Sequence, residues 1–373
     1  MKLFIFHIIL IILLPNSSFS QEKNDTFYES IQPYLYENPN KAITIAKNKI
    51  SEEKNIDIQI KYYLYLAKAY TAKRDFDASF KTLLNAKAIV EKSSNIASKI
   101  DVLILIAIQY QQMELYNKCL ETLDEVDAIC ANLNTTFSNE KYSWLGKIYA
   151  IRGIIYKSSE NYDIALEKFL KAIHNLKNAP QSIANTNNTS IVYYNMGYCF
   201  LLLHNNSEAE INFKKAINYA KKSKAVSLEA YALKGLGDNY FLQKEYNLAL
   251  TNFENAKVKA SKIGDVVLNE GIYKGLADSY LSIGNFNEYN VHNELYKKTQ
   301  FEREQNELKS INSLLNNIDN TTQNSIKEME NRYTIITTSI AIITFLMSFF
   351  FIFKTLKINK LNKEKQKRIA AII

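Results

Sequence analysis

The middle of the chain repeats one short pattern six times, and this repetition limits the fold more than any other feature. In each repeat a small residue is followed three positions later by an aromatic residue, and successive repeats begin 40 to 46 residues apart. The six pairs are Ala67/Tyr70, Ala107/Tyr110, Gly153/Tyr156, Gly197/Phe200, Gly237/Tyr240 and Ala277/Tyr280. Residues three apart share one face of a helix. The pattern therefore predicts a helix on which the small residue lets a second helix approach, while the aromatic ring fills the space beside that contact.

The second half of each repeat predicts the partner helix. Another aromatic residue comes nine positions after the small one in five repeats, at Phe76, Tyr116, Tyr162, Tyr246 and Phe286. Small residues return at Ser79, Cys119, Ala165, Ala209 and Ala249, each followed four positions later by a bulky residue: Leu83, Leu123, Phe169, Phe213 and Phe253. One helix pair leaves an apolar face that the next pair covers, so such units are stable as a stack. With only 9 glycines and 4 prolines in the chain, we predict an all-α solenoid of helix–turn–helix repeats.

These residues resemble the tetratricopeptide repeat (TPR) family. One full unit of the family's small and aromatic positions is formed by Gly153, Tyr156, Tyr162, Ala165, Phe169 and Ala172. The family's tryptophan near the start of the repeat and its proline at the end are missing, and the period exceeds the usual length of about 34 residues. We interpret this as longer helices or connections. On this resemblance, residues 21–298 form a TPR-like solenoid of about six repeats, with residues 26–50 as a degenerate leading unit.

The resemblance also implies a binding surface, because the first helices of a TPR-like solenoid line a concave groove. The residues expected in this groove are Tyr194, Tyr198, Lys234, Asp238, Phe241, Lys274 and Asp278. A groove that mixes aromatic and charged side chains suits an extended peptide or protein segment. The alternative is that Lys234–Asp238 and Lys274–Asp278 are ordinary i,i+4 ion pairs on a solvated face, worth roughly 0.2–0.5 kcal/mol each.

Two strongly apolar segments lie near the ends of the chain. Residues 1–20 combine Lys2, a 12-residue apolar run and small residues before Gln21, which predicts a cleaved signal peptide. Residues 333–353 are uncharged and form a helix of about 31 Å, enough to span a bilayer. Basic residues dominate the tail at 354–373, and positive charge stays in the cytoplasm. We therefore expect a single-pass inner-membrane protein with a periplasmic amino-terminal domain.

Residues 299–332 continue the helical pattern up to the predicted span. Leu308, Ile311, Leu315 and Ile318 follow the 3-4-3 spacing of a coiled coil. This juxtamembrane helix is therefore a candidate for homodimerisation above the membrane. The alternative is a capping helix that folds back on the solenoid, and the sequence favours neither.

The net charge of +8 belongs mostly to the tail. Residues 354–373 carry +6 of it, so the exported body is close to neutral. A neutral body lacks the basic surface that binding to a phosphate backbone requires. We expect no nucleic-acid binding through the body, while the tail fixes the topology and contacts anionic lipid headgroups.

The sequence contains no arrangement that indicates catalysis, a cofactor or a metal. It has no phosphate-binding loop and no zinc-ligand spacing, and its four histidines stand apart from other ligand types. Cys119 and Cys130 lie 11 residues apart, about 16 Å along one helix and too far for a disulfide. We expect them and Cys199 to be buried, and we expect no enzyme activity.

The order of leader, TPR-like array, juxtamembrane helix, span and basic helix is similar to the exported sensory half of TPR-containing sensor histidine kinases and membrane-bound transcription regulators. In those families an output domain follows the cytoplasmic helix. No histidine occurs after His292, and no ATP-binding or DNA-binding motif is present. We expect a receptor-like protein that binds a peptide or protein and relays a signal to a cytoplasmic partner or to an output domain missing from this chain. The alternative is a non-signalling envelope scaffold.

Overall fold

The computed structural model describes residues 34–133, 137–261 and 263–370. These residues form fourteen helices, α2 to α15, and contain no strand. The all-α solenoid predicted from the sequence is therefore confirmed. The predicted signal peptide, residues 1–20, and the start of the leading unit at 26–33 lie outside the described residues.

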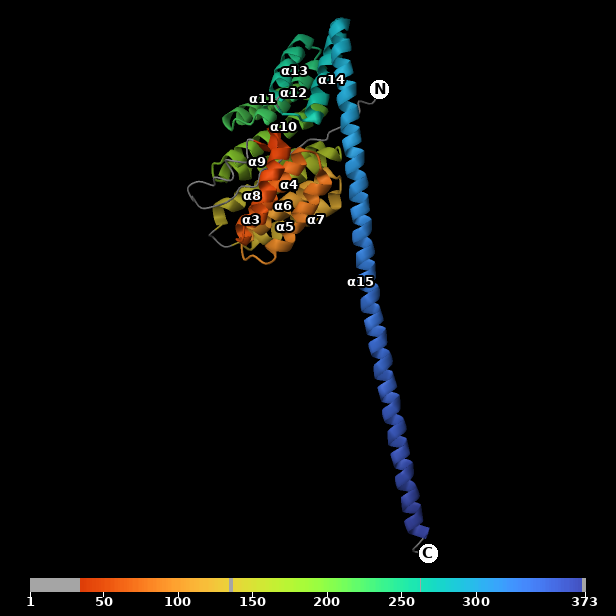
Figure 1. The fold of residues 1–373 in the computed structure, drawn as a ribbon. Coiled ribbons are helices and arrows are strands. Elements are labelled where there is room, and N and C mark those ends of the chain that lie inside the picture. Colours follow the sequence, from red (N-terminus) through yellow and green to blue (C-terminus); the bar gives the residue numbers. More distant parts are fainter. Residues whose placement is uncertain (1–33, 134–136, 262, 371–373) are drawn as a thin grey trace. The chain divides into compact units, whose positions relative to one another are not determined.

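The helices follow one another as antiparallel pairs (Figure 1). A short α2 (Tyr34–Glu37) and α3 (Pro39–Glu52) precede the first pair. The pairs are α4 (Ile56–Ala72) with α5 (Phe76–Val90), α6 (Ile96–Gln112) with α7 (Tyr116–Ala131), α8 (Ser138–Ser158) with α9 (Tyr162–Asn178), α10 (Ile183–Leu202) with α11 (Asn206–Lys222), and α12 (Val226–Leu242) with α13 (Tyr246–Ala260). The sixth pair begins with α14 (Val266–Ser282), and its second helix is the start of the long α15 (Phe286–Ala370).

The pairs stack in two layers. Each first helix contacts its own second helix and also the first helix of the next pair, as α4 does with α6 and α10 with α12. Each second helix packs against the first helices on either side of it. Because the first helices lie closer to one another than the second helices do, the stack curves with the first helices on its inner face.

In the later pairs, one phenylalanine of the second helix fills the space between two glycines. A Cβ atom built on Gly197 of α10 would lie 2.7 Å from Phe213, and one built on Gly235 of α12 would lie 2.4 Å from the same ring. Phe253 lies in the same way against Gly237 and Gly275, at 2.7 and 2.4 Å. Non-bonded carbons do not approach one another so closely, so all four positions require glycine while the rings stay in place. Each ring therefore joins its own pair to the next one.

The aromatic residues of the small–aromatic pairs have a different place from the one predicted. Phe200, near the end of α10, is only partly buried and packs against the margin of the core. The space beside Gly197 is filled by Phe213 of the second helix, so the expectation that Phe200 fills it is wrong. The physical reason is the position of Phe200 in the last turn of its helix, where the chain already turns away. The other five aromatics, Tyr70, Tyr110, Tyr156, Tyr240 and Tyr280, are also partly buried at the margin.

In the first pairs, aliphatic residues occupy the positions of the bridging phenylalanines and of the second glycine. Leu83 and Leu123 replace the phenylalanines and are fully buried. The small residues are Ala67 and Ala107, and Leu105 and Ile151 stand where the later pairs have Gly235 and Gly275. A smaller residue on the second helix is thus accompanied by larger residues on the first helices.

One turn conformation joins the first and second helix in all six cases. The backbone N–H of Asp75 donates to the carbonyl of Tyr70 at 2.9 Å, and Arg74 between them has a φ of 60°. This is the helix ending in which a left-handed residue lets the chain reverse. The left-handed residues are Arg74, Glu114, Glu160, His204, Lys244 and Gly284. The aromatic residue of each small–aromatic pair supplies the carbonyl that closes the turn, as Phe200 does for the N–H of Asn205 at 2.8 Å.

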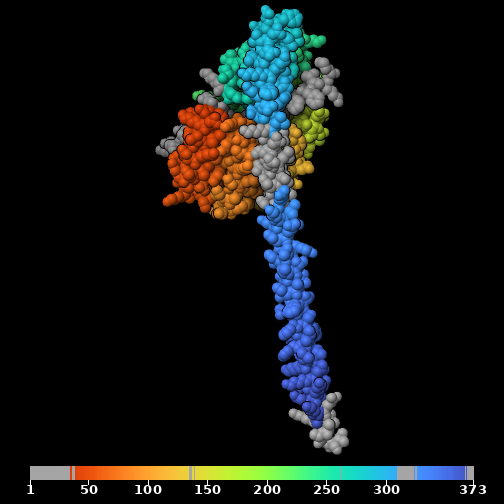
Figure 2. Space-filling model, turned by 45° about the vertical axis from the view of Figure 1, so that its right-hand side comes forward, coloured from red at the N-terminus to blue at the C-terminus, as the bar shows by residue number. Residues whose placement is uncertain are grey.

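The final helix belongs to two compact units, divided between Ser310 and Ile311. Within the first unit, the beginning of α15 lies beside α14, as Figures 1 and 2 show in cyan. There His292 is buried, and its ring stacks on Tyr280 of α14 at 5.3 Å. Within the second unit, Ile326–Lys365 contains a stretch that is apolar and long enough to cross a membrane, with a mean hydropathy of 2.3 in its most apolar window. The predicted span at 333–353 falls inside it.

Candidate functional site

The inner face of α10 and α12 carries a compact group of hydrogen-bonded side chains. The Tyr198 hydroxyl donates to Asp238 Oδ2 at 2.6 Å. Lys234 Nζ donates to the same carboxylate oxygen at 2.7 Å and to the Tyr198 hydroxyl at 3.1 Å. Lys234 and Asp238 keep about a quarter of their side-chain surface exposed. The three residues join neighbouring first helices and present charge to the inner face.

Further tyrosines extend this group on its apolar side. The Tyr194 ring packs edge-on against Tyr198 at 5.0 Å and against Tyr231 at 5.9 Å. The Tyr231 hydroxyl donates to Asp265 Oδ2 at 2.7 Å. Burial, together with the neighbouring carboxylates, raises the pKa of Tyr198 and Tyr231 well above the usual value. These hydroxyls therefore stay protonated and act as hydrogen-bond donors.

Lys157 of α8 approaches the same face from the preceding pair. Its Nζ donates to Asn195 Oδ1 at 2.7 Å and lies 5.9 Å from the centre of the Tyr198 ring. Only 4% of Lys157 is exposed, and burial lowers its pKa to about 7. The thiol of Cys199 favours the charged amine, whereas Lys234 opposes it. A buried amine thus lies beside the tyrosine group.

The residues predicted from the sequence divide into two sets. Tyr194, Tyr198, Lys234 and Asp238 lie together in this one network. The others do not join it by any contact described above: Lys274 pairs with Asp278 at 2.6 Å on a more exposed surface, and Phe241 packs against Tyr246. Both i,i+4 ion pairs considered in the sequence are formed, but only Lys234–Asp238 also holds a tyrosine of the neighbouring helix.

A second polar group lies in the earlier pairs. The indole N–H of Trp144 on α8 donates to Asp101 Oδ1 on α6 at 3.1 Å, and Lys147 Nζ lies 3.6 Å from the same oxygen. Lys68 of α4 is 6% exposed and feels both Asp101 and Lys147 electrostatically. Burial lowers the pKa of Lys68 to about 7 and also lowers the pKa of Lys147. Three helices thus bring two buried amines to one buried carboxylate.

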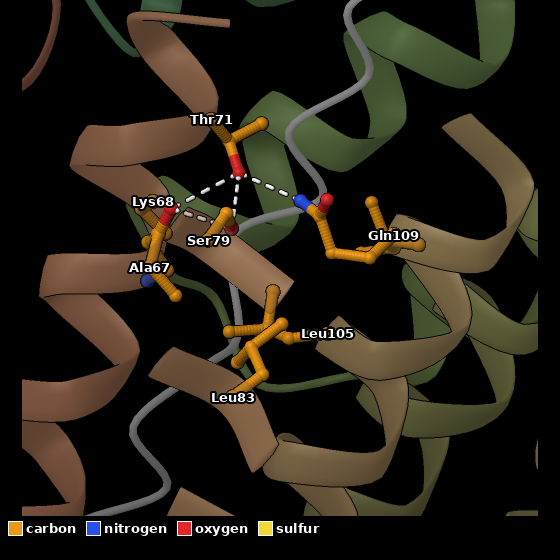
Figure 3. Close-up of a pocket in the computed structure, with 8 residues that line it drawn as sticks. Ala67, Lys68, Thr71, Ser79, Leu83, Leu105 and Gln109 are labelled. Atoms are coloured by element: carbon orange, nitrogen blue, oxygen red, sulfur yellow. Dashed lines mark hydrogen bonds between the residues drawn. The ribbon is translucent and has the colours of Figure 1, made fainter. Parts of the chain in front are cut away.

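A cavity of about 20 Å³ adjoins Lys68 (Figure 3). Its polar wall is a hydrogen-bonded group centred on the hydroxyl of Thr71, which accepts from Gln109 Nε2 at 2.7 Å and lies 2.9 Å from the hydroxyl of Ser79. Its apolar wall includes Leu83 and Leu105. The cavity therefore occurs where the first pairs have leucine in place of the phenylalanine of the later pairs.

Residues near the start of α15 connect the last pair with the first one. Arg303 is 6% exposed, and its Nε donates to Glu270 of α14 at 2.5 Å. Its Nη1 donates to Glu307 at 2.7 Å. Glu307 in turn accepts from Nη2 of Arg74, in the turn after α4, at 3.2 Å. One stretch of α15 is thus held by charged hydrogen bonds to both ends of the stack, and we call these four residues the α15 clasp.

The chemically reactive groups of the described residues give no sign of a catalytic centre. Cys119, Cys130 and Cys199 are free and buried, and burial raises the pKa of each thiol to about 12. Such thiols are poor nucleophiles. Among the described residues, no three His, Cys, Asp or Glu side chains are placed to hold a metal ion.

Sequence reasoning missed the buried lysines. Lys68, Lys147 and Lys157 carry no local signal, since an isolated lysine on a helix usually lies in water. Their burial becomes visible only when the repeats are superposed. Lys157 comes four residues after Gly153, the small residue of its repeat. Lys68 directly follows Ala67, the small residue of its own repeat, and Tyr198 and Asp238 occupy the same position in later repeats. A repeat-by-repeat alignment would have indicated the inner face.

Comparison with solved structures identifies the type of solenoid. The chain is similar to a Rap protein crystallised in complex with Competence and Sporulation Factor, with a TM-score of 0.57, 16% identity, and coverage of 79% of this chain and 83% of that one. It is also similar to the apo form of the quorum sensor NprR from B. thuringiensis, with a TM-score of 0.51, 20% identity, and coverage of 74% and 73%. No protein-family model and no curated protein matches the sequence.

These neighbours are TPR-like proteins. At such low identities the similarity concerns the fold alone. This chain is accordingly a TPR-like solenoid, as the small and aromatic positions of its repeats predicted.

Proposed function

We propose that this protein is a membrane-anchored receptor whose exported solenoid binds a peptide or protein segment along its inner face. The observation that carries the proposal is the network of Tyr198, Lys234 and Asp238, which places hydrogen-bond donors and acceptors beside aromatic rings on neighbouring first helices. Such a surface binds both the backbone and the side chains of an extended segment. The complex of the similar Rap protein with Competence and Sporulation Factor supports a binding role for this fold. We propose no catalytic role.

We further propose that α15 relays the bound state. The α15 clasp ties Glu307 to the first pair and Arg303 to the last pair, so a ligand that changes the curvature of the stack changes these contacts. The same helix continues without a break to Ala370, through the candidate membrane span within Ile326–Lys365. A relay therefore needs only the first and last pairs to shift relative to the start of α15. A cytoplasmic partner or a further output domain would receive the signal.

The proposed location is the inner membrane, with the solenoid in the periplasm and residues 354–373 in the cytoplasm. The support comes from the apolar leader at 1–20, the apolar segment in α15 and the basic residues that follow it. Protease added to intact spheroplasts tests this directly. We expect degradation of the solenoid and protection of the tail, and a protected solenoid would refute the topology.

Peptide selection on the purified full-length protein in detergent tests the binding role. We expect a randomised decapeptide library to yield binders whose affinity falls at least tenfold in Lys234→Met and in Tyr198→Phe. The matched control is Lys171→Met, since Lys171 lies on the outer helix α9 with half of its side chain exposed. Selected peptides that bind all variants equally would show that the inner face is not the binding surface.

Disulfide trapping in α15 tests the relay. Lys327 is exposed, and the three native cysteines are buried, so a Lys327→Cys variant reports on proximity between two copies of the helix with little background. We expect a selected peptide to change the yield of the cross-linked dimer, and Arg74→Gln to weaken that response. An unchanged yield, together with full function after deletion of residues 357–373, would favour a scaffold that only anchors.

A further inference from the structure

Helices α4, α6 and α8 bring together a buried group of side chains in which amines outnumber carboxylates. Lys68, Asp101 and Lys147 come from three successive first helices, and none of them is more than 6% exposed. Asp101 already accepts from the Trp144 indole and faces Lys147. No other carboxylate acts on Lys68. Charged groups are rarely buried unless they are paired, so this excess of amines over carboxylates requires an explanation.

Lys147 makes the imbalance sharper. Its Nζ is fully buried and has no hydrogen-bond partner among the residues that the structure describes, because Asp101 lies 3.6 Å away. An ammonium group has three donors. A single carboxylate oxygen at this distance leaves most of the hydrogen-bonding capacity of a buried ammonium unused, which is destabilising. The buried Lys147 amine can therefore still donate to a further hydrogen-bond acceptor supplied by a ligand.

We propose that Lys68 and Lys147 bind a carboxylate of the ligand, so that the peptide taken by this solenoid is acidic. The inference rests on the proposed peptide-binding function and adds the chemistry of its ligand. A carboxylate has two oxygens and can accept from both amines at once. The cavity beside Lys68, about 20 Å³ in volume, admits a group of roughly one water molecule in size.

The rest of the inner face agrees with an acidic ligand. Lys157 is a third buried amine, held only by the neutral Asn195 and Tyr198 and facing Lys234. The inner-face carboxylates of Asp238 and Asp265 are already engaged by tyrosine hydroxyls. A basic peptide would meet unpaired amines, whereas an acidic one would neutralise them.

Binding of this kind is coupled to proton uptake. Burial lowers the pKa of Lys68 to about 7, against the raising effect of Asp101 and with the lowering effect of Lys147. At pH 8 most of the free protein therefore carries a neutral Lys68, which must gain a proton before it can pair with a carboxylate. Affinity for an acidic ligand should fall as the pH rises from 6 to 8, and this fall should be absent when arginine replaces Lys68.

The experiment uses Trp144, the only tryptophan of the chain. Its indole donates to Asp101, so its emission reports on a ligand that reaches this group. The full-length protein in detergent is titrated with a randomised decapeptide pool containing three fixed glutamates, with a matched pool containing three fixed lysines, and with succinate. We expect a saturable change with the glutamate pool alone, and at least tenfold weaker binding of it in Lys68→Met and Lys147→Met. Lys171→Met is the unaffected control.

Lys68→Arg supplies a readout that a merely structural role would not change. It keeps the positive charge, and we expect it to retain affinity at pH 6 and to lose the decrease between pH 6 and 8. This variant also serves if removal of Lys147 impairs folding, which circular dichroism would reveal. A pH profile that is the same in Lys68→Arg and the parent would overturn the proposal.

The other outcomes separate this inference from the function on which it rests. Preference for the lysine pool, with loss in Lys234→Met, would keep the peptide-binding role and overturn the acidic ligand. Succinate binding as tightly as the glutamate pool would assign the carboxylate to a free acid and overturn a peptide source. No binding of either pool would overturn both proposals.

Discussion

The first pairs and the later pairs of the solenoid solve one packing problem in two ways. In the later pairs Phe213 fills the space between Gly197 and Gly235. In the first pair Leu83 stands at the phenylalanine position, with Ala67 and Leu105 at the glycine positions. The volume removed from the second helix returns on the first helices, although the leucine arrangement leaves the cavity beside Lys68.

What stays constant between the two regions is the total side-chain volume at the contact between one second helix and the two first helices on either side of it. A small residue is required only where a large ring lies opposite it, as at Gly235 and Gly275. Close packing of this kind penalises both added and missing volume. A residue such as Ala67 or Gly197 can therefore not be replaced by its counterpart from the other region unless the facing residue, Leu83 or Phe213, is replaced as well.

The largest expected effect comes from placing the early solution into a later pair. Gly235→Leu alone should destabilise the protein by about 3 kcal/mol, since even its Cβ would lie 2.4 Å from Phe213. Phe213→Leu alone should cost about 1–2 kcal/mol through the cavity it leaves. Urea unfolding followed by circular dichroism measures both.

The double variant is the decisive control for this prediction. Gly235→Leu with Phe213→Leu reproduces the arrangement of the first pair, and its loss should be smaller than the sum of the single losses by at least about 1 kcal/mol. Simple additivity would mean that the two positions do not share one volume.

A smaller effect is the response of the stability to pH, which comes from buried lysines. Burial lowers the pKa of Lys68 and Lys157 to about 7, from 10.5 in the unfolded chain. The unfolded state then binds more protons, so stability rises with pH between these values, by at most about 1.4 kcal/mol per pH unit for each lysine. From pH 7 to 8.5, we expect a gain on the order of 1–2 kcal/mol for each.

Substitution assigns this pH dependence to its source. Lys68→Met should stabilise the protein most at pH 6 and flatten the rise in stability, with Asp101 and Lys147 unchanged around it. Lys171→Met should leave the slope intact, because Lys171 lies on the outer helix α9 with half of its side chain exposed. The measurement is urea unfolding at several pH values, and equal slopes in Lys68→Met and the parent would contradict the assignment.

The smallest effect concerns a feature that the two regions share. Glu114 in an early pair and Lys244 in a later one have φ angles of 58° and 64°, a conformation that costs a residue with a Cβ about 1–2 kcal/mol. Glu114→Gly and Lys244→Gly should each stabilise the protein by about 1 kcal/mol, to the same extent in both regions. Alanine at either position should give no gain, and unequal gains would show that the turns differ in strain.

Much of the fold follows from the sequence because the repeat exposes the volumes that matter. Ala67, Gly153 and Gly197 stand out as small residues at a constant position, and their partners Leu83 and Phe213 recur at another.

Other features of the repeat are not visible in its spacing. A constant distance from Gly197 places Phe200 on the right helix face but does not show that the helix ends there, so its partial exposure was missed. The left-handed turn residues were not predicted either. Five of the six carry ordinary side chains, such as Arg74 and His204, and the usual glycine signal appears only at Gly284.

The candidate site was predictable in part because of local spacing. Tyr194 and Tyr198 lie four residues apart on α10, and Lys234 and Asp238 lie four residues apart on α12, so each pair shares one face of its helix. The Asp101–Lys147 pair joins helices 46 residues apart in the sequence, and the α15 clasp joins Arg74 with Glu307 across most of the chain. Such contacts depend on the curvature of the stack, which local spacing does not specify.

The phenylalanine rings that pack between glycines of neighbouring repeats influence the order in which the solenoid unfolds. Phe213 and Phe253 each bridge two consecutive units, whereas the early leucines leave a void at the corresponding seam. In a linear stack, cooperativity is set by the interfaces between neighbours. Melting should therefore start at the amino-terminal units and spread toward α14, with amide hydrogens of α4 and α6 exchanging before those of α12.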